Sequence, residues 1–287
     1  MRTGVFGAQP ESRGVCALLH GQTEFIEKYA EVIGELNARG FTVATFDWRG
    51  QGRSQRLLAD PLKSYVRDFA QFDDDLQSFL EQVVRPLSDK PPIALGHSMG
   101  AHILLRTLHD KPQAIRAAVM TAPMLAISTR GYPGWLTRLV TALYSGLGFG
   151  GDFAWGMAGR DPFLITFDTQ LVTSDAARFA RVQDFLKDYP DLRLAGPTWG
   201  WIEAAYRSMM RVNAPGYAEA IPMPVLICGA GKDRIVLTDA ERAFAARMPL
   251  GEYLDFPDSE HEILMENDAI RARFWAAFDA FLARMGE

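Results

Sequence analysis

The chain has 287 residues, of which 48% are hydrophobic and 23% are charged, and its formal net charge is -5 at pH 7. This length can bury a large core and corresponds to one large domain, or to one domain that carries an insertion. The acidic balance provides no positive field to attract phosphate groups, so we expect no nucleic-acid partner.

Residues 1–14 lack the apolar stretch of a secretory signal peptide, and no later run of about 18 apolar residues is free of charges, glycine and proline. We therefore expect a cytoplasmic protein that does not span a membrane, while peripheral contact with the inner membrane stays open. Cys16 and Cys228 lie in short apolar runs, which predicts buried thiols rather than a disulfide or a reactive site. Nothing in the sequence decides the oligomeric state.

Short apolar runs recur along the chain, with helical patterns between most of them. Strands connected through helices form parallel pairs, because each connection has to cross a face of the sheet. The predicted fold class is therefore α/β, with a mostly parallel central sheet and helices on both faces. The predicted strands are 15–19, 42–46, 93–96, 117–120, 225–229 and 253–256, and the predicted helices include 25–39, 69–83 and 270–281.

Two motifs are predicted to hold neither a metal nor a cofactor. The acidic run 73–75 lies inside a predicted helix, where consecutive side chains point in different directions, so a solvated helix face is expected. The glycines of 146–151 satisfy the G-x-G-x-x-G pattern, but no strand precedes them and no βαβ unit surrounds them. We expect no nucleotide or other cofactor.

Residues 123–220 interrupt the alternation of strands and helices with glycine and proline clusters and helical segments, and no convincing strand is found there. We predict an α/β core of residues 1–122 and 221–287, with a helical cap, or lid, at 123–220. Four of the six tryptophans fall in this insertion, which suits either an apolar substrate surface or the insertion's own core. Of these tryptophans, Trp199 and Trp201 are the candidate substrate contacts.

The sequence G-H-S-M-G at 96–100 follows a predicted strand and precedes a predicted helix. In that context the pentapeptide predicts a nucleophile elbow, a sharp turn that exposes the hydroxyl of Ser98. Glycine is required at 96 and 100 because the strand and helix backbones approach too closely there for side chains. A serine hydroxyl is a poor nucleophile at neutral pH, so a base and a group that orients the base must lie nearby.

The base is predicted to be His261. In this type of site the order along the chain is serine, then an acid, then histidine, and the other four histidines lie before Ser98 or on the helix that follows it. The acid should follow a strand, and Asp233 comes just after the strand 225–229. Asp255 and Asp258 lie too close in sequence to the histidine to be preferred.

An acyl-transfer site also needs two backbone N–H groups for the oxyanion of the tetrahedral intermediate. The residue after the nucleophile, Met99, supplies one, and Gln22 in the loop after the first predicted strand supplies the other. Glu24, Asp47 and Arg49 are interpreted as structural side chains that brace this loop and its neighbour.

With these residues placed, the chain resembles the α/β-hydrolase superfamily, and within it the monoacylglycerol lipases and bacterial lysophospholipases. The resemblance covers nearly the whole chain through the blocks LLHGQTEFIEKYAEVIGELNARGF, FDWRGQGRSQR, LGHSMGAH, GAGKDRIV and SEHEILMEND. It implies that Ser98, Asp233 and His261 form a catalytic triad and that the amides of Gln22 and Met99 form the oxyanion hole. The segment 171–201 is similar to the cap of the lysophospholipases.

We therefore expect a serine hydrolase that cleaves carboxylic esters of monoacyl lipids, with a small-molecule or lipid ester as its partner. Two alternative enzymatic hypotheses are a broad carboxylesterase for short acyl esters and a serine aminopeptidase. A non-enzymatic reading is a ligand-binding receptor that kept the hydrolase fold.

Overall fold

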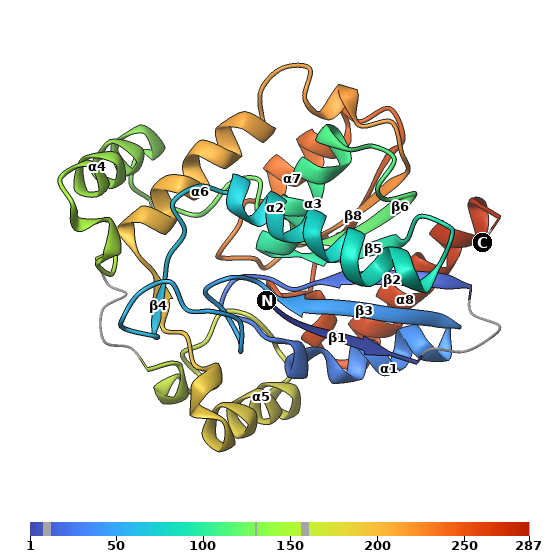
Figure 1. The fold of residues 1–287 in the computed structure, drawn as a ribbon, viewed down its shortest axis with the longest axis horizontal. Helices are drawn as coiled ribbons and strands as arrows, with labels where there is room; N and C mark the ends of the chain where they lie inside the picture. Colours follow the sequence, from blue (N-terminus) through green and yellow to red (C-terminus); the bar gives the residue numbers. More distant parts are fainter. Residues whose placement is uncertain (8–12, 130, 156–160, 287) are drawn as a thin grey trace.

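The computed structural model of the chain describes residues 1–7, 13–129, 131–155 and 161–286. Within these residues one large sheet contains six parallel strands and one antiparallel strand at its edge (Figure 1). In order across the sheet, the strands are β1 (Arg2–Phe6), β3 (Phe41–Asp47), β2 (Gly14–Leu19), β5 (Ile93–His97), β6 (Ala117–Thr121), β8 (Val225–Ala230) and β9 (Gly251–Phe256).

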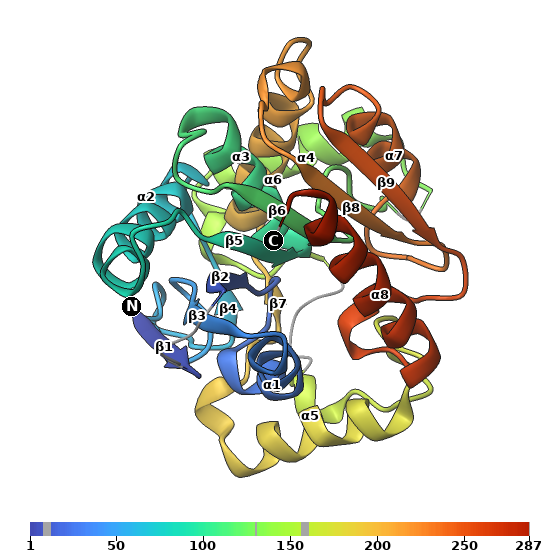
Figure 2. The same ribbon diagram turned by 90° about the vertical axis from the view of Figure 1, so that its right-hand side faces the viewer.

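Helices cover both faces of this sheet, as predicted (Figure 2). The two faces have separate apolar cores, one packed beneath α1 (Ala30–Ala38) and α8 (Asp268–Arg284), the other beneath α2 (Ala70–Phe79), α3 (Ser98–Asp110) and α7 (Thr238–Ala245). The described chain also has 3-10 helices at Ile26–Tyr29, Arg85–Leu87, Phe149–Gly151, Pro162–Leu164, Pro190–Leu192, Ala218–Ala220 and Ile263–Met265, and a π-helical turn at Leu80–Val84.

The segment between β6 and β8 carries α4 (Gly134–Gly146), α5 (Ala176–Asp188) and α6 (Trp199–Val212). Figure 1 shows α4 and α5 beyond the end of the sheet toward which the parallel strands run. The prediction that this segment has no strand is wrong for a two-residue strand, β7 (Gly196–Pro197), which pairs in parallel with β4 (Lys63–Ser64). Two residues are too few to produce a recognisable pattern of alternating polarity.

Two further features differ from the sequence predictions. The edge strand β1 was not predicted, because its side chains are mostly exposed and its sequence RTGVF has no apolar run. The acidic run of α2 is not a simple solvated face, since Asp73 pairs with the buried Arg106 and Asp75 pairs with Arg49. Only long-range packing, which places these arginines opposite the helix, could have indicated the pairs.

Both cysteines are buried and free, as predicted. Burial raises the pKa of the Cys16 thiol to about 12, so it stays protonated and unreactive at neutral pH. Among the described residues, no helix is both long and apolar enough to cross a membrane.

Glu241 of α7 is an unusual carboxyl, because it is fully buried and neither of its oxygens has a hydrogen-bond partner among the described residues. Burial, followed by repulsion from Asp233 and Asp255, raises the pKa of Glu241 to about 9. The folded protein therefore holds this side chain neutral at pH 7. In the unfolded chain its pKa is the ordinary 4.5, so the carboxyl is ionised above that pH.

The stabilisation associated with Glu241 should fall as the pH rises from about 4.5 to about 9, because the folded state retains a proton that the unfolded state releases. Glu241→Gln, which is neutral at every pH, should raise the free energy of unfolding by on the order of 1–3 kcal/mol at pH 8 and change it little at pH 5. Urea unfolding at the two pH values measures the difference. An equal effect at both values, or the same pH dependence in the exposed control Asp258→Asn, would contradict the assignment.

Candidate active site

Ser98 lies at the sharp turn between β5 and α3. Its backbone has φ of 51°, the left-handed region that non-glycine residues rarely adopt. The close approach predicted for the two glycines is present: a Cβ at Gly96 would lie 2.9 Å from Cα of Ala101, and one at Gly100 would collide with the carbonyl of His20. The strained turn presents the Ser98 hydroxyl to His261.

His261 lies between β9 and α8, in a loop at the same edge of the sheet as the elbow. Its Nε2 is 3.0 Å from Oγ of Ser98, and its Nδ1 is 2.6 Å from Oδ2 of Asp233. A neutral imidazole that donates from Nδ1 to the carboxylate has Nε2 free to accept the serine proton. The structure thus brings together three side chains that are widely separated in sequence.

Asp233 follows β8 in a tight turn and its side chain is fully buried. Its second oxygen, Oδ1, accepts the backbone N–H groups of Ile235 at 2.7 Å and Val236 at 3.0 Å. Burial alone would raise the pKa of this carboxyl, but the hydrogen bond and charge of His261, together with the two amides, lower it below its ordinary value. Asp233 is therefore held as an anion facing the imidazole.

The loop after β2 presents the Gln22 amide in an environment that leaves its N–H free. The amides on either side are engaged, since Gly21 donates to Glu24 and Thr23 donates to Gln51. No described residue accepts the N–H of Gln22. Met99 is in the first turn of α3, where N–H groups have no partner within the helix. Both amides thus have the donor capacity expected of an oxyanion hole.

Glu24, Asp47 and Arg49, predicted to brace the loops, form hydrogen bonds within or between these loops and α2. The turn of Glu24 is closed by its bond to Gly21, and Asp47 accepts the backbone N–H groups of Ile26 at 2.9 Å and Arg53 at 2.8 Å. Arg49 makes two hydrogen bonds to Asp75 on α2, both of 2.6 Å. These contacts fix the two loops that flank Ser98.

Trp199 and Trp201 both lie in the first turn of α6 and are nearly buried, with exposed fractions of 6% and 5%. Trp199 stacks on Tyr144 of α4 at 4.8 Å between ring centroids and meets Trp155 edge-on. Trp201 packs on Phe69, at 5.8 Å. These contacts belong to packing of the insertion onto itself and onto the core, and a role in binding substrate stays a prediction.

Two charged residues beside the site were not singled out from the sequence. Lys28 and Glu262 form a buried ion pair of 2.6 Å, and Glu262 directly follows His261. The spacing of Glu24 and Lys28, four residues apart, could have indicated that these two pair. Nothing in the sequence connects either of them to Glu262, which lies 234 residues further along.

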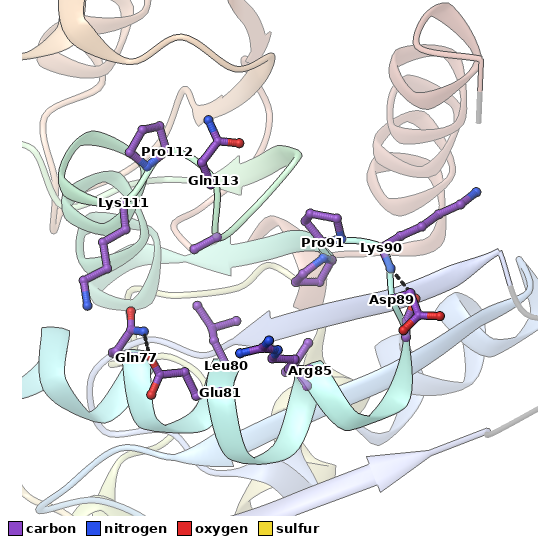
Figure 3. A pocket seen from close by; sticks show the side chains of 14 residues that line it. Gln77, Leu80, Glu81, Arg85, Asp89, Lys90, Pro91, Lys111, Pro112 and Gln113 are labelled. Carbon is purple, nitrogen blue, oxygen red and sulfur yellow. Dashed lines mark hydrogen bonds between the residues drawn. The ribbon is translucent and has the colours of Figure 1, made fainter.

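A cavity of about 440 Å³ lies elsewhere, between the end of α2 and the loops that precede β5 and β6 (Figure 3). Figure 3 shows Glu81 and Arg85 on one side of it and Lys111 on the other. Its walls include the Pro91–Pro92 segment at the amino end of β5, whereas Ser98 follows the carboxyl end of that strand. This cavity is therefore not part of the site around Ser98.

A family model and the sequences of two curated relatives place the chain in the same family. Residues 10–268 match the family described as "Serine aminopeptidase, S33". Lysophospholipase L2 of Escherichia coli (strain K12) is 34% identical over 275 residues, covering 93% of this chain and 79% of the relative. The probable lysophospholipase L2 of Haemophilus influenzae is 28% identical over 276 residues, covering 96% of this chain and 86% of the relative.

Among solved structures, a soluble variant of monoglyceride lipase from Saccharomyces cerevisiae superimposes with a TM-score of 0.77 at 20% identity, covering 98% of this chain and 90% of that one. At this identity the likeness concerns the fold, and it confirms the expected α/β-hydrolase architecture. The family match over most of the length, with the identity to lysophospholipase L2, shows that this chain belongs to the α/β-hydrolase family described as "Serine aminopeptidase, S33".

Proposed function

We propose that the protein is a serine hydrolase that cleaves the carboxylic esters of monoacyl lipids, lysophospholipids or monoacylglycerols, through an acyl-enzyme on Ser98. The observation that carries the proposal is the continuous hydrogen-bonded chain from Asp233 through His261 to Ser98. The names of the relatives, lysophospholipase L2 and monoacylglycerol lipase, support the substrate class.

In the acylation step, Oγ of Ser98 attacks the ester carbonyl carbon while Nε2 of His261 takes the hydroxyl proton. The carbonyl oxygen becomes an oxyanion, which accepts hydrogen bonds from the N–H groups of Gln22 and Met99. The imidazolium that forms is stabilised by the Asp233 carboxylate. It then donates its proton to the departing alcohol oxygen, and the ester bond to that oxygen breaks.

In the deacylation step, a water molecule gives a proton to His261 and attacks the acyl-serine carbonyl. The second tetrahedral intermediate uses the same two amides, and its collapse breaks the bond to Oγ of Ser98 and returns the proton to that oxygen. The products are a fatty acid and the glycerol-containing alcohol. The burial of Ser98 and His261, with exposed fractions of 8% and 4%, limits the access of bulk water to the reacting atoms.

We assign residues 123–220 the role of a cap over this site, with 1–122 and 221–287 as the catalytic core. Trp199 and Trp201 would then form part of the base of the cap, where an acyl chain requires apolar surface. Gln22 is bulkier than a small residue would be at the oxyanion loop, so its side chain would influence the shape of the pocket beside Ser98.

A triad mechanism predicts a large effect of Asp233→Asn. An amide at this position cannot stabilise the imidazolium and favours the wrong tautomer of His261, so kcat should fall by about 10³–10⁴-fold. Steady-state hydrolysis of a monoacylglycerol measures the loss, and labelling with a fluorophosphonate probe should disappear entirely in Ser98→Ala. The exposed neighbour Asp258→Asn is the control and should retain parental activity. A correctly folded parent that resists the probe would exclude the mechanism.

The acyl preference distinguishes a lipid hydrolase from an esterase for short substrates. Each additional buried CH2 of the acyl chain contributes about 0.8 kcal/mol, so kcat/KM should rise by about threefold or more per methylene over a series of medium-length chains. A panel of lysophospholipid, monoacylglycerol, short nitrophenyl ester and aminoacyl amide measures the preference. Highest kcat/KM on the short ester would favour the carboxylesterase reading, and highest on the amide would favour the aminopeptidase.

We also propose that the insertion contacts lipid surfaces through α4 and the residue that follows it. Trp135, Leu139, Leu143 and Leu147 recur at intervals of four residues and so share one helix face, and each is more than half exposed. An exposed apolar helix face is typical of a surface that docks into the headgroup region of a membrane. Contact there would bring the insertion to the source of monoacyl lipids.

The double substitution Leu139→Glu/Leu143→Glu should reduce binding to phosphatidylcholine vesicles at least tenfold, because two charged side chains on this helix face oppose its entry into the apolar part of the bilayer. Cosedimentation with vesicles measures binding, and activity on a short water-soluble ester should persist. Leu250→Glu is a matched control, because Leu250 is about half exposed but lies outside the insertion. Equal vesicle binding by all three proteins would argue against this surface.

A further inference from the structure

A group of three charged side chains lies buried beside the site. The ammonium of Lys28 is 2.7 Å from Oε1 of Glu24 and 2.6 Å from Oε1 of Glu262, so one cation bridges two carboxylates. Their side chains are 7%, 4% and 10% exposed, respectively. Lys28 reaches this position from the 3-10 helix Ile26–Tyr29, which leads into α1.

Each end of this bridge holds a part of the proposed catalytic machinery. Glu24 accepts the backbone N–H of Gly21 and the hydroxyl of Tyr29, which fixes the turn that carries the Gln22 amide. Glu262 is bonded through the chain to His261, and its own backbone N–H donates to the carbonyl of Val172 at 2.8 Å. The ammonium is therefore a physical link between the loop of an oxyanion donor and the loop of the base.

Burying three charged side chains carries a large desolvation penalty. Burial alone would lower the pKa of Lys28, but the two carboxylates outweigh that effect and raise it. Burial would likewise raise the pKa of Glu24, but the Lys28 ammonium and the nearby histidines lower it, whereas the pKa of Glu262 stays raised. Buried ion groups are often no more stabilising than apolar side chains of similar volume. Fold stability alone therefore gives little reason for charges at this position.

The same residues belong to a group that has the composition of a metal site. Glu24, His97 and Glu262 offer ligand atoms within 4.8 Å of one another. The Lys28 ammonium, however, already lies within hydrogen-bond distance of both carboxylates and supplies the positive charge. Burial lowers the pKa of His97 to about 3, so its ring is neutral, and its Nδ1 is 3.0 Å from Oγ1 of Thr121. We assign the group no metal.

We propose that Lys28 is a positioning residue: by bridging Glu24 and Glu262, it sets the placement of the Gln22 amide relative to the His261 imidazole. This role rests on the proposed function, because it concerns the alignment of the oxyanion donor and the base. The link acts on the transition state, in which both groups must reach the same substrate carbonyl, and much less on the binding of the ground-state ester.

Lys28→Met removes the bridge while keeping the length of the side chain. We expect kcat to fall by about 10–100-fold, the loss typical of displacing reacting groups by up to 1 Å, with KM changed less than about twofold. Affinity for an alkylboronic acid, which forms a tetrahedral adduct on the serine, should fall by a similar factor. Affinity for a non-hydrolysable ether analogue of the substrate should be retained. Lys28→Arg, which preserves both ion pairs, should restore most of kcat.

Arg106→Met is the matched control, since it also removes a buried cation from a carboxylate, Asp73. The hydrogen bonds of Arg106 go to Asp73 and Ser208, which lie outside the two loops. It should lower the melting temperature without the loss of kcat. If Lys28→Met does not fold, Glu262→Gln provides the same test, because it keeps the volume and removes the charge at the end of the bridge near the histidine.

Parental kcat in a folded Lys28→Met or Glu262→Gln variant would overturn the positioning role, and so would equal losses of kcat in Lys28→Met and Arg106→Met. These outcomes leave the proposed function intact as long as the parent shows turnover that depends on Ser98. Absence of such turnover in the parent would instead overturn the proposed function, and the positioning role with it.

Discussion

The geometry of the site depends on the two hydrogen bonds of the His261 imidazole. His261 faces Ser98 with one nitrogen and Asp233 with the other, so its ring can occupy only a narrow range of positions. The parallel sheet makes this geometry attainable, because β5 and β8 end at the same edge and are separated by β6 alone. The strained elbow places Ser98, and the amides of Ile235 and Val236 hold Asp233. The Lys28 bridge joins the loop of His261 to the loop of Gln22.

Much of this arrangement is readable from the sequence, for identifiable physical reasons. Buried parallel strands are apolar on both faces, so runs such as 93–96 and 225–229 are conspicuous, and the glycines of 96–100 mark a close backbone approach. The sequence predictions of Ser98, Asp233 and His261 used the order of residue types along the chain, the predicted strands before Ser98 and Asp233, and the family resemblance. Their mutual distances required the folded structure, and their catalytic roles remain predictions that substitution can test.

Other elements could not be predicted because they depend on contacts between distant segments. The edge strand β1 has little apolar character and is defined by its pairing with β3. The bridge from Lys28 to Glu262 spans 234 residues, and the pairing of Asp73 with Arg106 joins two helices. In each case the local sequence is compatible with a solvated surface, and only packing against another element makes the interaction.

The order in which the site's components occur along the chain has a consequence for folding. Ser98 and the loop of Gln22 belong to the first half of the chain, whereas Asp233 and His261 come with β8, β9 and α8 at its end. A chain that lacks its last fifth keeps the elbow sequence around Ser98 but has neither Asp233 nor His261. The hydrogen-bonded chain from Asp233 to Ser98 is thus complete only after β8 and β9 have joined the sheet beside β6, so its presence reports that this edge of the sheet is fully assembled.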